Sequence, residues 1–476
     1  MSDSGKSFRS APPSRPRPRL AILGGGVAGL AAGYFAKKKG IPFAVYEARD
    51  RIGGNCVTYE HGGHLFDSGA HRFHDQNEDV TGELTRLLGS RFQRISVPSR
   101  IYHQGRQIDF PLSPLNLIMR LGPLSCAKIG LEILQSRLGA ERGPNGNFEH
   151  FALRTYGKTL SARFLLNYTE KLWGIPCSDL SQEVSKSRMR GLTLMAFLKE
   201  AFLGKAEKTE HLDGSFYYPL GGIGEIPEVL ADACGKNTIF LGAPVTKVLQ
   251  RDARIRSVVI DKTRTIDVDE VLSTLPLSRF VQILEPAPPE DVLNSARNLS
   301  YRQILLVALF LNKKSVTRSA TVYFPAADFL FSRVYEPKNR SDRMSSQERT
   351  SLVAEIPCSL GDETWRMDDD VVARKVRLKL IEIGWIRESD VEGAAVHRLH
   401  DAYPVLSVDS EDRRRLVFNY LAQFRNLKCL GRTACFQYLH IHDLVGGAKA
   451  MIEDLGREPI ALRPFADAKP RLSRRG

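Results

Sequence analysis

The chain has few cysteines and no long hydrophobic run. Its seven cysteines are scattered over 476 residues without a CxxC spacing, which excludes a zinc ribbon and a dithiol redox pair. Such isolated cysteines indicate reduced thiols and a cytoplasmic protein. The longest apolar runs, such as Ile304–Leu311, are far below the ~18 residues that a membrane span requires. The amino terminus also has no apolar core of a signal peptide, so nothing in the sequence predicts export.

Acidic residues are too few to balance the basic ones, and the excess is concentrated at the two ends. The net charge is +14, and residues 1–19 and 463–476 each hold five basic residues against one acidic residue. These ends are rich in Arg and Pro, which predicts disordered tails at 1–19 and 461–476. Such tails allow weak contacts with membrane surfaces or other anions, but nucleic-acid binding is not expected. The remaining positive charge favours an anionic small-molecule substrate, and the oligomeric state is not predicted.

A glycine turn follows the first apolar segment. Leu20–Leu23 predicts a short strand, and Gly24-x-Gly26-x-x-Gly29 leads from it into an Ala-rich helix. Gly24 permits a tight turn, Gly26 lets the backbone approach a pyrophosphate, and Gly29 lets helix and strand pack closely. The alternative is a purely structural glycine turn. That alternative would have to reproduce strand, turn and helix in register by chance, so we predict dinucleotide binding.

The residues after the second strand distinguish FAD from NAD. Phe43–Tyr46 predicts that strand, and Glu47 at its end lies where an acid binds a ribose hydroxyl. The run that continues from Glu47 and Ala48 contains Arg51 and two glycines, Gly53 and Gly54. A second glycine loop lets a longer cofactor continue past the pyrophosphate, and Arg51 can neutralise a phosphate. We therefore predict FAD as the cofactor.

Longer motifs extend over most of the chain. They are GGGVAGL and YEARDRIGGN near the start, then SGAHRFH (68–74), YTEKLWGIPCSDL (168–180), FYYPLGGIGEIPEVLA (216–231), STLPL (273–277), AYPV (402–405) and GRTACFQYLHIHD (431–443). With these motifs, about residues 20–460 resemble the flavoprotein superfamily of amine oxidases, protoporphyrinogen oxidases and carotenoid-type desaturases. The most similar part is the protoporphyrinogen-oxidase-like branch that borders UDP-galactopyranose mutase.

The resemblance implies further FAD contacts. Val245 corresponds to the family position whose backbone meets the adenine, and Gly431 with Arg432 to the segment along the pyrophosphate and ribityl chain. Asp443, with a helix expected to begin at Leu444, corresponds to the site where amides face the flavin pyrimidine ring. A helix start at that place would stabilise negative charge on reduced flavin.

His71 and Arg72 are the candidate catalytic residues. They lie in the segment that this superfamily brings against the isoalloxazine, where a His can donate to the flavin and an Arg can hold an anion. The alternative is that they only brace the cofactor loop. A metal site made of His61, His64, His71 and His74 fits no known ligand spacing, so no metal is predicted.

Two further groups have open roles. In YTEKLWG, Tyr168, Lys171 and Trp173 either stack on a flat substrate or pack a helix end, and packing with one edge toward a cavity is slightly favoured. Arg302, Tyr323, Arg333 and Tyr403 lie on expected strands and are not assigned to catalysis.

The predicted fold class is α/β, with a Rossmann-like FAD-binding domain interleaved with a mixed-sheet and helical substrate domain. FAD-binding segments are expected at 20–112, 215–277 and 396–460. Residues 113–214 are expected to form a helical substrate segment, and 278–395 the substrate sheet.

Two reactions remain open. The first is an FAD-dependent oxidoreductase (an oxidase, dehydrogenase or desaturase) that takes a hydride from a small organic substrate onto flavin. The second is a non-redox enzyme resembling UDP-galactopyranose mutase that acts on a nucleotide sugar. FYYPLGGIGEIPEVLA favours the first, whereas HRFHDQNEDV and YTEKLWG favour the second.

Overall fold

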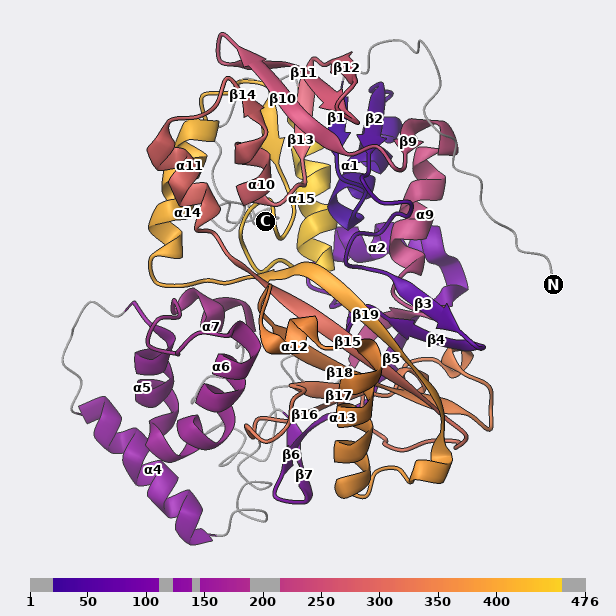
Figure 1. Cartoon of the computed structure of the whole chain (residues 1–476), viewed down its shortest axis with the longest axis vertical. Helices are drawn as coiled ribbons and strands as arrows, with labels where there is room; N and C mark the ends of the chain where they lie inside the picture. The colour runs from indigo at the N-terminus through magenta and orange to yellow at the C-terminus, as the bar shows by residue number, and fades with distance from the viewer. Residues whose placement is uncertain (1–19, 111–122, 139–145, 189–214, 456–476) are drawn as a thin grey trace, which may run out of the picture.

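The upper half of the molecule in Figure 1 contains a parallel five-stranded sheet. The computed structural model describes residues 20–110, 123–138, 146–188 and 215–455. The sheet has the order β20-β13-β1-β2-β9, and all four pairings are parallel. Its strands are β1 (Leu20–Leu23), β2 (Phe43–Tyr46), β9 (Ile239–Phe240), β13 (Glu270–Ser273) and β20 (Leu427–Cys429).

Helix α1 (Val27–Lys38) packs closely because its residues are small. Its Ala and Gly residues are buried, and a Cβ added to Gly33 would come within 2.8 Å of the Phe43 ring and 2.9 Å of Cys234 Sγ. Helix α1 contacts α9 (Glu225–Cys234) and α15 (Ile441–Glu453), and α2 (Glu78–Leu88) lies beside α9 and α15. Segments from the start, middle and end of the chain therefore form one layered unit.

A second, seven-stranded sheet forms much of the lower half (Figure 1). Its order is β19-β15-β18-β17-β16-β6-β7. The strands are β6 (Ser99–His103), β7 (Arg106–Phe110), β15 (Tyr301–Leu311), β16 (Thr321–Tyr323), β17 (Arg333–Tyr335), β18 (Thr350–Cys358) and β19 (Val391–Pro404). Strand β15 pairs antiparallel with β18 and β19, and α13 (Asp369–Glu382) packs on β15 and β19. Strand β18 is buried throughout, since both faces of the sheet are covered.

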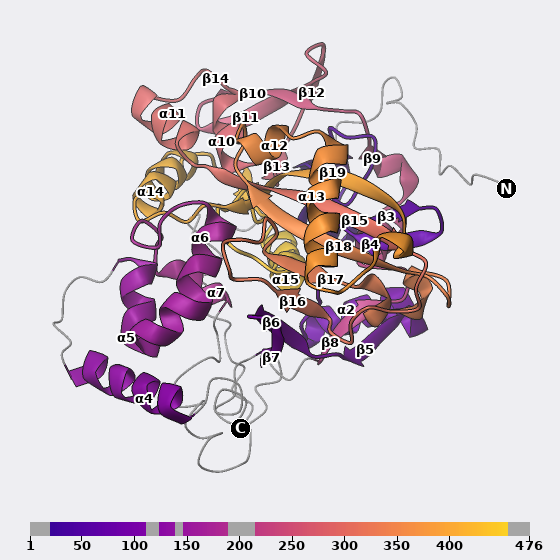
Figure 2. The same cartoon turned by 60° about the horizontal axis from the view of Figure 1, so that its bottom comes forward.

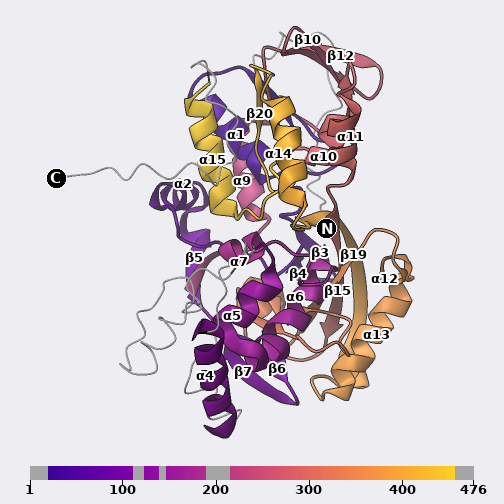
Figure 3. The same cartoon turned by 90° about the vertical axis from the view of Figure 1, so that its left-hand side faces the viewer.

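Helices occupy one side of this second sheet (Figures 2 and 3). They are α4 (Pro123–Leu138), α5 (Phe148–Leu160), a π-helical turn (Ser161–Leu166), α6 (Asn167–Trp173) and α7 (Glu183–Arg188). Outermost is α4, which buries Ile129 and Ile133 but exposes Leu124, Leu131 and Leu134. Within the described ranges, none of the helices is long and apolar enough to cross a bilayer.

Smaller elements complete the two halves. A four-stranded sheet has the order β12-β11-β10-β14, and two-stranded pairs join β3 to β4 and β5 to β8. The strands are β3 (Thr58–His61), β4 (His64–Asp67), β5 (Phe92–Ser96), β8 (Ser215–Pro219), β10 (Val245–Arg251), β11 (Arg254–Ile260), β12 (Arg264–Asp267) and β14 (Leu284–Glu285). The helices are α10 (Leu277–Gln282), α11 (Glu290–Arg297), α12 (Glu363–Arg366) and α14 (Ser410–Leu421).

The fold class predicted from the sequence is confirmed, and two details differ from expectation. Helix α15 begins at Ile441 rather than Leu444, because Asp443 is the third residue of its first turn and caps it. Strands β6 and β7 fall inside the expected first FAD-binding segment, 20–112, and most of β19 falls inside the expected third segment, 396–460, but all three strands pair within the seven-stranded sheet. The expected helical segment lies partly at 113–122, 139–145 and 189–214, outside the described residues.

Candidate functional site

The glycine turn lies where the strand order reverses. Strand β1 is flanked by β2 on one side and β13 on the other, and ligands bind at such switch points beyond the carboxyl ends of the strands. Thr274 follows β13, and both its backbone N–H and its hydroxyl donate to Leu23 O at 2.8 Å. Gly24, directly after β1, therefore lies against Thr274.

Each of the three fingerprint glycines is needed for a different physical reason. Gly24 has φ +107°, and an added Cβ would lie 2.2 Å from Thr274 Oγ1. A Cβ on Gly29 would lie 2.0 Å from Gly24 O, so close packing of helix and strand needs this glycine. A Cβ on Gly26 would meet only Gly54 Cα, at 3.9 Å. The protein itself leaves the space beside Gly26 open, which fits a pyrophosphate at the start of α1.

Glu47 is buried against the same turn. Its carboxylate accepts the Gly25 N–H at 2.7 Å and the Arg49 N–H at 2.9 Å. The second glycine loop closes over the first, because Gly53 N–H donates to Gly25 O at 2.9 Å. Gly53 and Gly54 both have positive φ, so this loop also depends on glycine. The two glycine motifs that predicted FAD are thus in direct contact.

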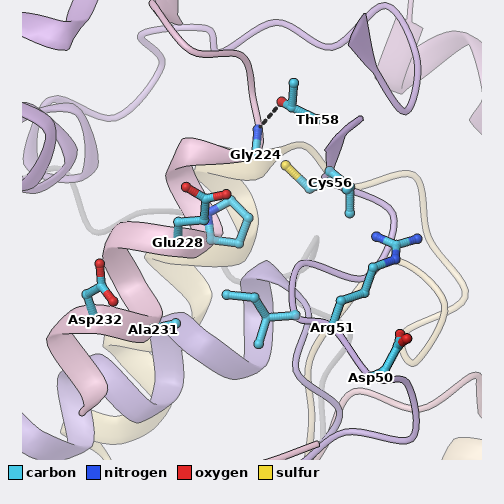
Figure 4. A pocket seen from close by; sticks show the side chains of 11 residues that line it. Asp50, Arg51, Cys56, Thr58, Gly224, Glu228, Ala231 and Asp232 are labelled. Carbon is cyan, nitrogen blue, oxygen red and sulfur yellow. Dashed lines mark hydrogen bonds between the residues drawn. The ribbon is translucent and has the colours of Figure 1, made fainter. Parts of the chain in front are cut away.

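Arg51 borders a pocket of about 270 Å³ between its loop and α9. Figure 4 shows Asp50 and Arg51 on one side and Glu228 and Asp232 on the other, near the Gly224 N–H that donates to Thr58 Oγ1. The fingerprint glycines do not line this pocket, so the crevice at β1 and β13, rather than this pocket, fits the cofactor. Arg51 Nη1 is buried without a hydrogen-bond partner among the described residues, and Arg51 Nη2 donates to the Tyr59 hydroxyl at 3.4 Å.

The predicted adenine side lies next to Glu47. Ala243 N–H donates to Glu47 O at 2.8 Å, and Gly242 N–H donates to Arg49 O at 2.9 Å. Val245, two residues farther, starts β10 and is buried, whereas Ala48 is exposed. Val245 therefore directly follows the segment whose amides pair with the backbone carbonyls of Glu47 and Arg49.

Gly431 and Arg432 return to the crevice from β20. Gly431 has φ +128°, and its added Cβ would lie 3.6 Å from Thr274 Cβ. The Arg432 guanidinium donates from Nη2 and Nε to Leu439 O, at 2.9 and 3.1 Å, and lies over the rings of Tyr403 and Tyr438. Arg432 therefore fixes the loop that leads into α15.

The first turn of α15 differs from the sequence prediction. Asp443 Oδ2 accepts the His440 N–H at 2.8 Å, and Leu444 N–H already donates to His440 O at 3.1 Å. The expected helix start at Leu444 is therefore wrong by three residues. The amides that begin the helix belong to Ile441 and His442 instead.

These observations fit FAD. The first turn of α1 and Gly26 would hold the pyrophosphate, Glu47 the adenosine ribose, and the Gly431 segment with the start of α15 the flavin end. When bound, FAD supplies hydride transfer, which no side chain of the protein supplies.

The predicted catalytic pair lies at one end of the second sheet. Arg72 Nη2 donates to Ser99 Oγ of β6 at 2.6 Å and to Thr321 Oγ1 of β16 at 3.1 Å, and burial lowers its pKa to about 10. Burial, together with Arg432, Arg333 and Arg340, lowers the pKa of His71 to about 3. His71 is therefore a neutral hydrogen-bonding group at physiological pH.

The positive charges of Arg333, Arg340 and Arg432 act on His71, and Arg72 follows it in the chain. We call Arg72, Arg333, Arg340 and Arg432 the guanidinium cluster. Arg333 pairs with Glu355 at 2.6 Å, and Arg340 lies 3.9 Å from Asp67. In the part of the chain that the structure describes, Arg72 and Arg432 have no carboxylate within ion-pair distance. The cluster therefore carries at least two more positive than negative charges.

Aromatic rings line the same region. Arg333 Nη2 donates to the Tyr403 hydroxyl at 3.1 Å, and Tyr403 stacks on Tyr438 with centroids 5.6 Å apart. The Trp173 ring lies 6.2 Å from both. Tyr168 meets Tyr323 edge-on at 5.7 Å. The cluster thus combines positive charge with flat, partly polar surfaces.

Other candidates have structural contacts. Arg302 donates to Leu172 O at 3.1 Å and Lys171 O at 3.2 Å, and so holds the carboxyl end of α6. Lys171 Nζ donates to Phe324 O at 2.9 Å, and burial lowers its pKa to about 8. The four histidines considered as metal ligands do not form one group, since His61 and His64 lie against Phe310, apart from His71 and His74. Among the described residues no set of three or more His, Cys, Asp or Glu is placed to hold a metal.

Sequence reasoning missed Asp67, Thr274, Arg340 and Glu355. Asp67 accepts from the Tyr218 hydroxyl at 2.6 Å and from Ile223 N–H at 3.0 Å. Glu355 had one signal, because it is a lone charge in the apolar run TSLVAEIPC. Arg340 and Thr274 have no local pattern that would mark them.

Comparison with known proteins agrees with this arrangement. Residues 27–421 match the family model of flavin-containing amine oxidoreductases. The chain is 35% identical to protoporphyrinogen oxidase 2 of Arabidopsis thaliana over 104 residues, which are 21% of this chain and only 20% of that protein.

Two solved structures have similar folds. Reduced UDP-galactopyranose mutase has a TM-score of 0.83 at 16% identity, covering 94% of this chain and 98% of that one. Cyclohexylamine oxidase from Brevibacterium oxydans has a TM-score of 0.66 at 16% identity, covering 93% and 100%. The cofactor predicted from the glycine motifs is FAD, and the family match extends over most of both sheets. The chain belongs to the family of flavin-containing amine oxidoreductases.

Proposed function

We propose that the protein is an FAD-dependent oxidoreductase whose substrate carries a negatively charged group that binds to the guanidinium cluster. The charge of the cluster supports this proposal. Arg72 is half-buried and faces hydroxyl groups rather than a carboxylate, and Arg333 Nε has no hydrogen-bond partner among the described residues. Arg72 has no carboxylate partner among the described residues, and a cation held away from water without one is costly, so a phosphate or carboxylate of the substrate would complete the site.

The protein's own residues would bind and orient the substrate. Arg72 and Arg333 would hold the anionic group, and the rings of Trp173, Tyr403 and Tyr438 would exclude water from its surroundings. His71, kept neutral by burial and by the neighbouring guanidinium groups, would offer a hydrogen bond without adding charge. Hydride transfer itself belongs to FAD.

A nucleotide-sugar mutase is the second candidate, and one observation favours it. Tyr168 and Trp173 lie on α6, and their rings contact Tyr323 and Tyr403 beside Arg333. Aromatic rings next to guanidinium groups suit a ligand that joins a flat base to a diphosphate. In that reaction the flavin would stay reduced and no electron acceptor would be consumed.

Absorption spectra of the FAD-loaded protein test both candidates. Under anaerobic conditions, we expect the flavin band to bleach with a carboxylated or phosphorylated reduced donor and to return with air. Conversion of UDP-galactopyranose only after dithionite reduction would favour the mutase instead. Bleaching by simple amines, but by no anionic donor, would contradict the proposed substrate class.

A further inference from the structure

Glu355 is a buried carboxylate in the interior of the seven-stranded sheet. It lies on β18, in register with Leu306 of β15 and Arg333 of β17, and its side chain is 2% exposed. A charge at such a place is stable only where opposite charge and hydrogen-bond donors face it. The partners of its two oxygens therefore indicate its role.

The two oxygens bind different parts of the site. Oε1 accepts the backbone N–H of Ala70, the residue before His71, at 2.6 Å. Oε2 pairs with Arg333 Nη2 at 2.6 Å, and the same Nη2 donates to the Tyr403 hydroxyl at 3.1 Å. One carboxylate thus joins the His71 loop to an arginine of the second sheet.

The His71 loop fits closely against this carboxylate. Gly69 has φ +137°, and an added Cβ would lie 3.4 Å from Glu355 Oε1 and 3.6 Å from His71 Nε2. His71 N–H also donates to Gly69 O at 2.7 Å. The loop backbone is therefore held by Glu355 on the side that faces the sheet.

We propose that Glu355 is a positioning residue that sets the distance between Arg333 and the His71 loop. The anionic group of the substrate, bound at Arg333, would then lie at a fixed place relative to the cofactor side of the site. This inference rests on the proposed function, since it assigns the substrate anion to Arg333. Both carboxylate oxygens are already bonded, so Glu355 acts through its partners rather than on the substrate.

Charge and position predict opposite effects on anion binding. A carboxylate beside Arg333 repels an incoming anion, so its removal would tighten binding if only charge mattered. If Glu355 orients Arg333, its removal weakens binding despite the gain in positive charge, because the donor is no longer held in place. The sign of the change therefore separates the two roles.

Three variants of the FAD-loaded protein provide the test, with inorganic pyrophosphate as the probe and the flavin spectrum as the signal. Glu355→Gln keeps the length, but its amide group can satisfy only one of the two partners. Glu355→Asp keeps the charge but is too short to reach both. Glu336→Gln is the control, because among the described residues buried Glu336 accepts hydrogen bonds from the Val316 and Thr317 amides, the Thr350 hydroxyl and the Asn339 side chain, and from no residue of the cluster.

We expect pyrophosphate to bind at least about tenfold more weakly to both Glu355 variants and unchanged to the control. Tighter binding to Glu355→Gln, with wild-type binding to Glu355→Asp, would overturn the inference. If pyrophosphate does not bind the wild type, the proposed function fails. Hydrogen exchange at the Ala70 amide then still tests the link, because it should accelerate in both Glu355 variants and not in the control. An Ala70 exchange rate that stays at the wild-type value in all three variants would overturn the positioning role of Glu355.

Discussion

The FAD crevice and the guanidinium cluster are both suited to anions, but they are built by opposite means. In the crevice, backbone amides at the start of α1 would face the ligand, and Gly24 and Gly26 carry no side chain that could obstruct it. In the cluster, arginines come from three distant parts of the chain, around residues 72, 333–340 and 432. The two regions meet at Gly431 and Arg432. A site made from backbone is broken by adding atoms, whereas one made from side chains is broken by removing them.

Adding a side chain to the fingerprint should have the largest effect. Gly29→Val would push a Cβ against Gly24 O, at 2.0 Å, so we expect no soluble folded protein. Gly26→Val meets nothing closer than 3.9 Å, so we expect a folded protein that purifies without FAD. The flavin-to-protein absorbance ratio and thermal unfolding measure the two effects. Full FAD occupancy in Gly26→Val would show that the pyrophosphate lies elsewhere.

Removing arginines should give smaller, separable effects. Arg72→Met leaves only two hydroxyl groups without their donor, so we expect FAD retention and at least about tenfold weaker pyrophosphate binding.

Arg302→Met leaves the Lys171 and Leu172 carbonyls unbonded, and should lower the free energy of unfolding by about 1–3 kcal/mol. It should not change anion affinity directly. Equal pyrophosphate affinity in Arg72→Met and the wild type would remove Arg72 from the substrate site.

The last prediction is a pH dependence of stability. The pKa of His71 is about 3 in the folded protein against an ordinary 6.5, so the unfolded state binds its proton first as the pH falls. Stability should therefore decrease between pH 6.5 and 3, by at most about 1.4 kcal/mol per pH unit from this residue. His71→Gln should have a correspondingly shallower slope in urea unfolding at pH 7, 6, 5 and 4. Parallel slopes would show that the cluster does not hold His71 neutral.

The same contrast explains how much the sequence predicted. Gly24, Gly26, Gly29 and Glu47 lie within 24 residues of one another, so their spacing alone predicted strand, turn, helix and cofactor. Arg72, Arg333 and Arg432 lie in distant parts of the sequence and meet around His71 only in the fold. No local spacing encodes such contacts, so the cluster was not predicted as a unit.

Individual side chains were predicted less well than backbone. Arg302 and Arg333 both lie on strands of the same sheet, and nothing in their neighbouring residues distinguishes them. Arg302 donates to two carbonyls of α6, whereas Arg333 Nε has no hydrogen-bond partner among the described residues. The family resemblance placed Asp443 just before a helix that begins at Leu444, whereas Asp443 lies inside the first turn of α15.

The interleaving of the chain also determines when the flavin site can form. Strand β20, which carries Gly431 to the crevice, comes from residues 427–429 and pairs with β13. During synthesis, β1 and α1 therefore leave the ribosome long before the strand that completes their sheet. Contacts of such long range slow folding, and a chain that stops before residue 427 would expose the edge of β13. FAD capture is thus expected to be a late event that reports completion of nearly the whole described chain.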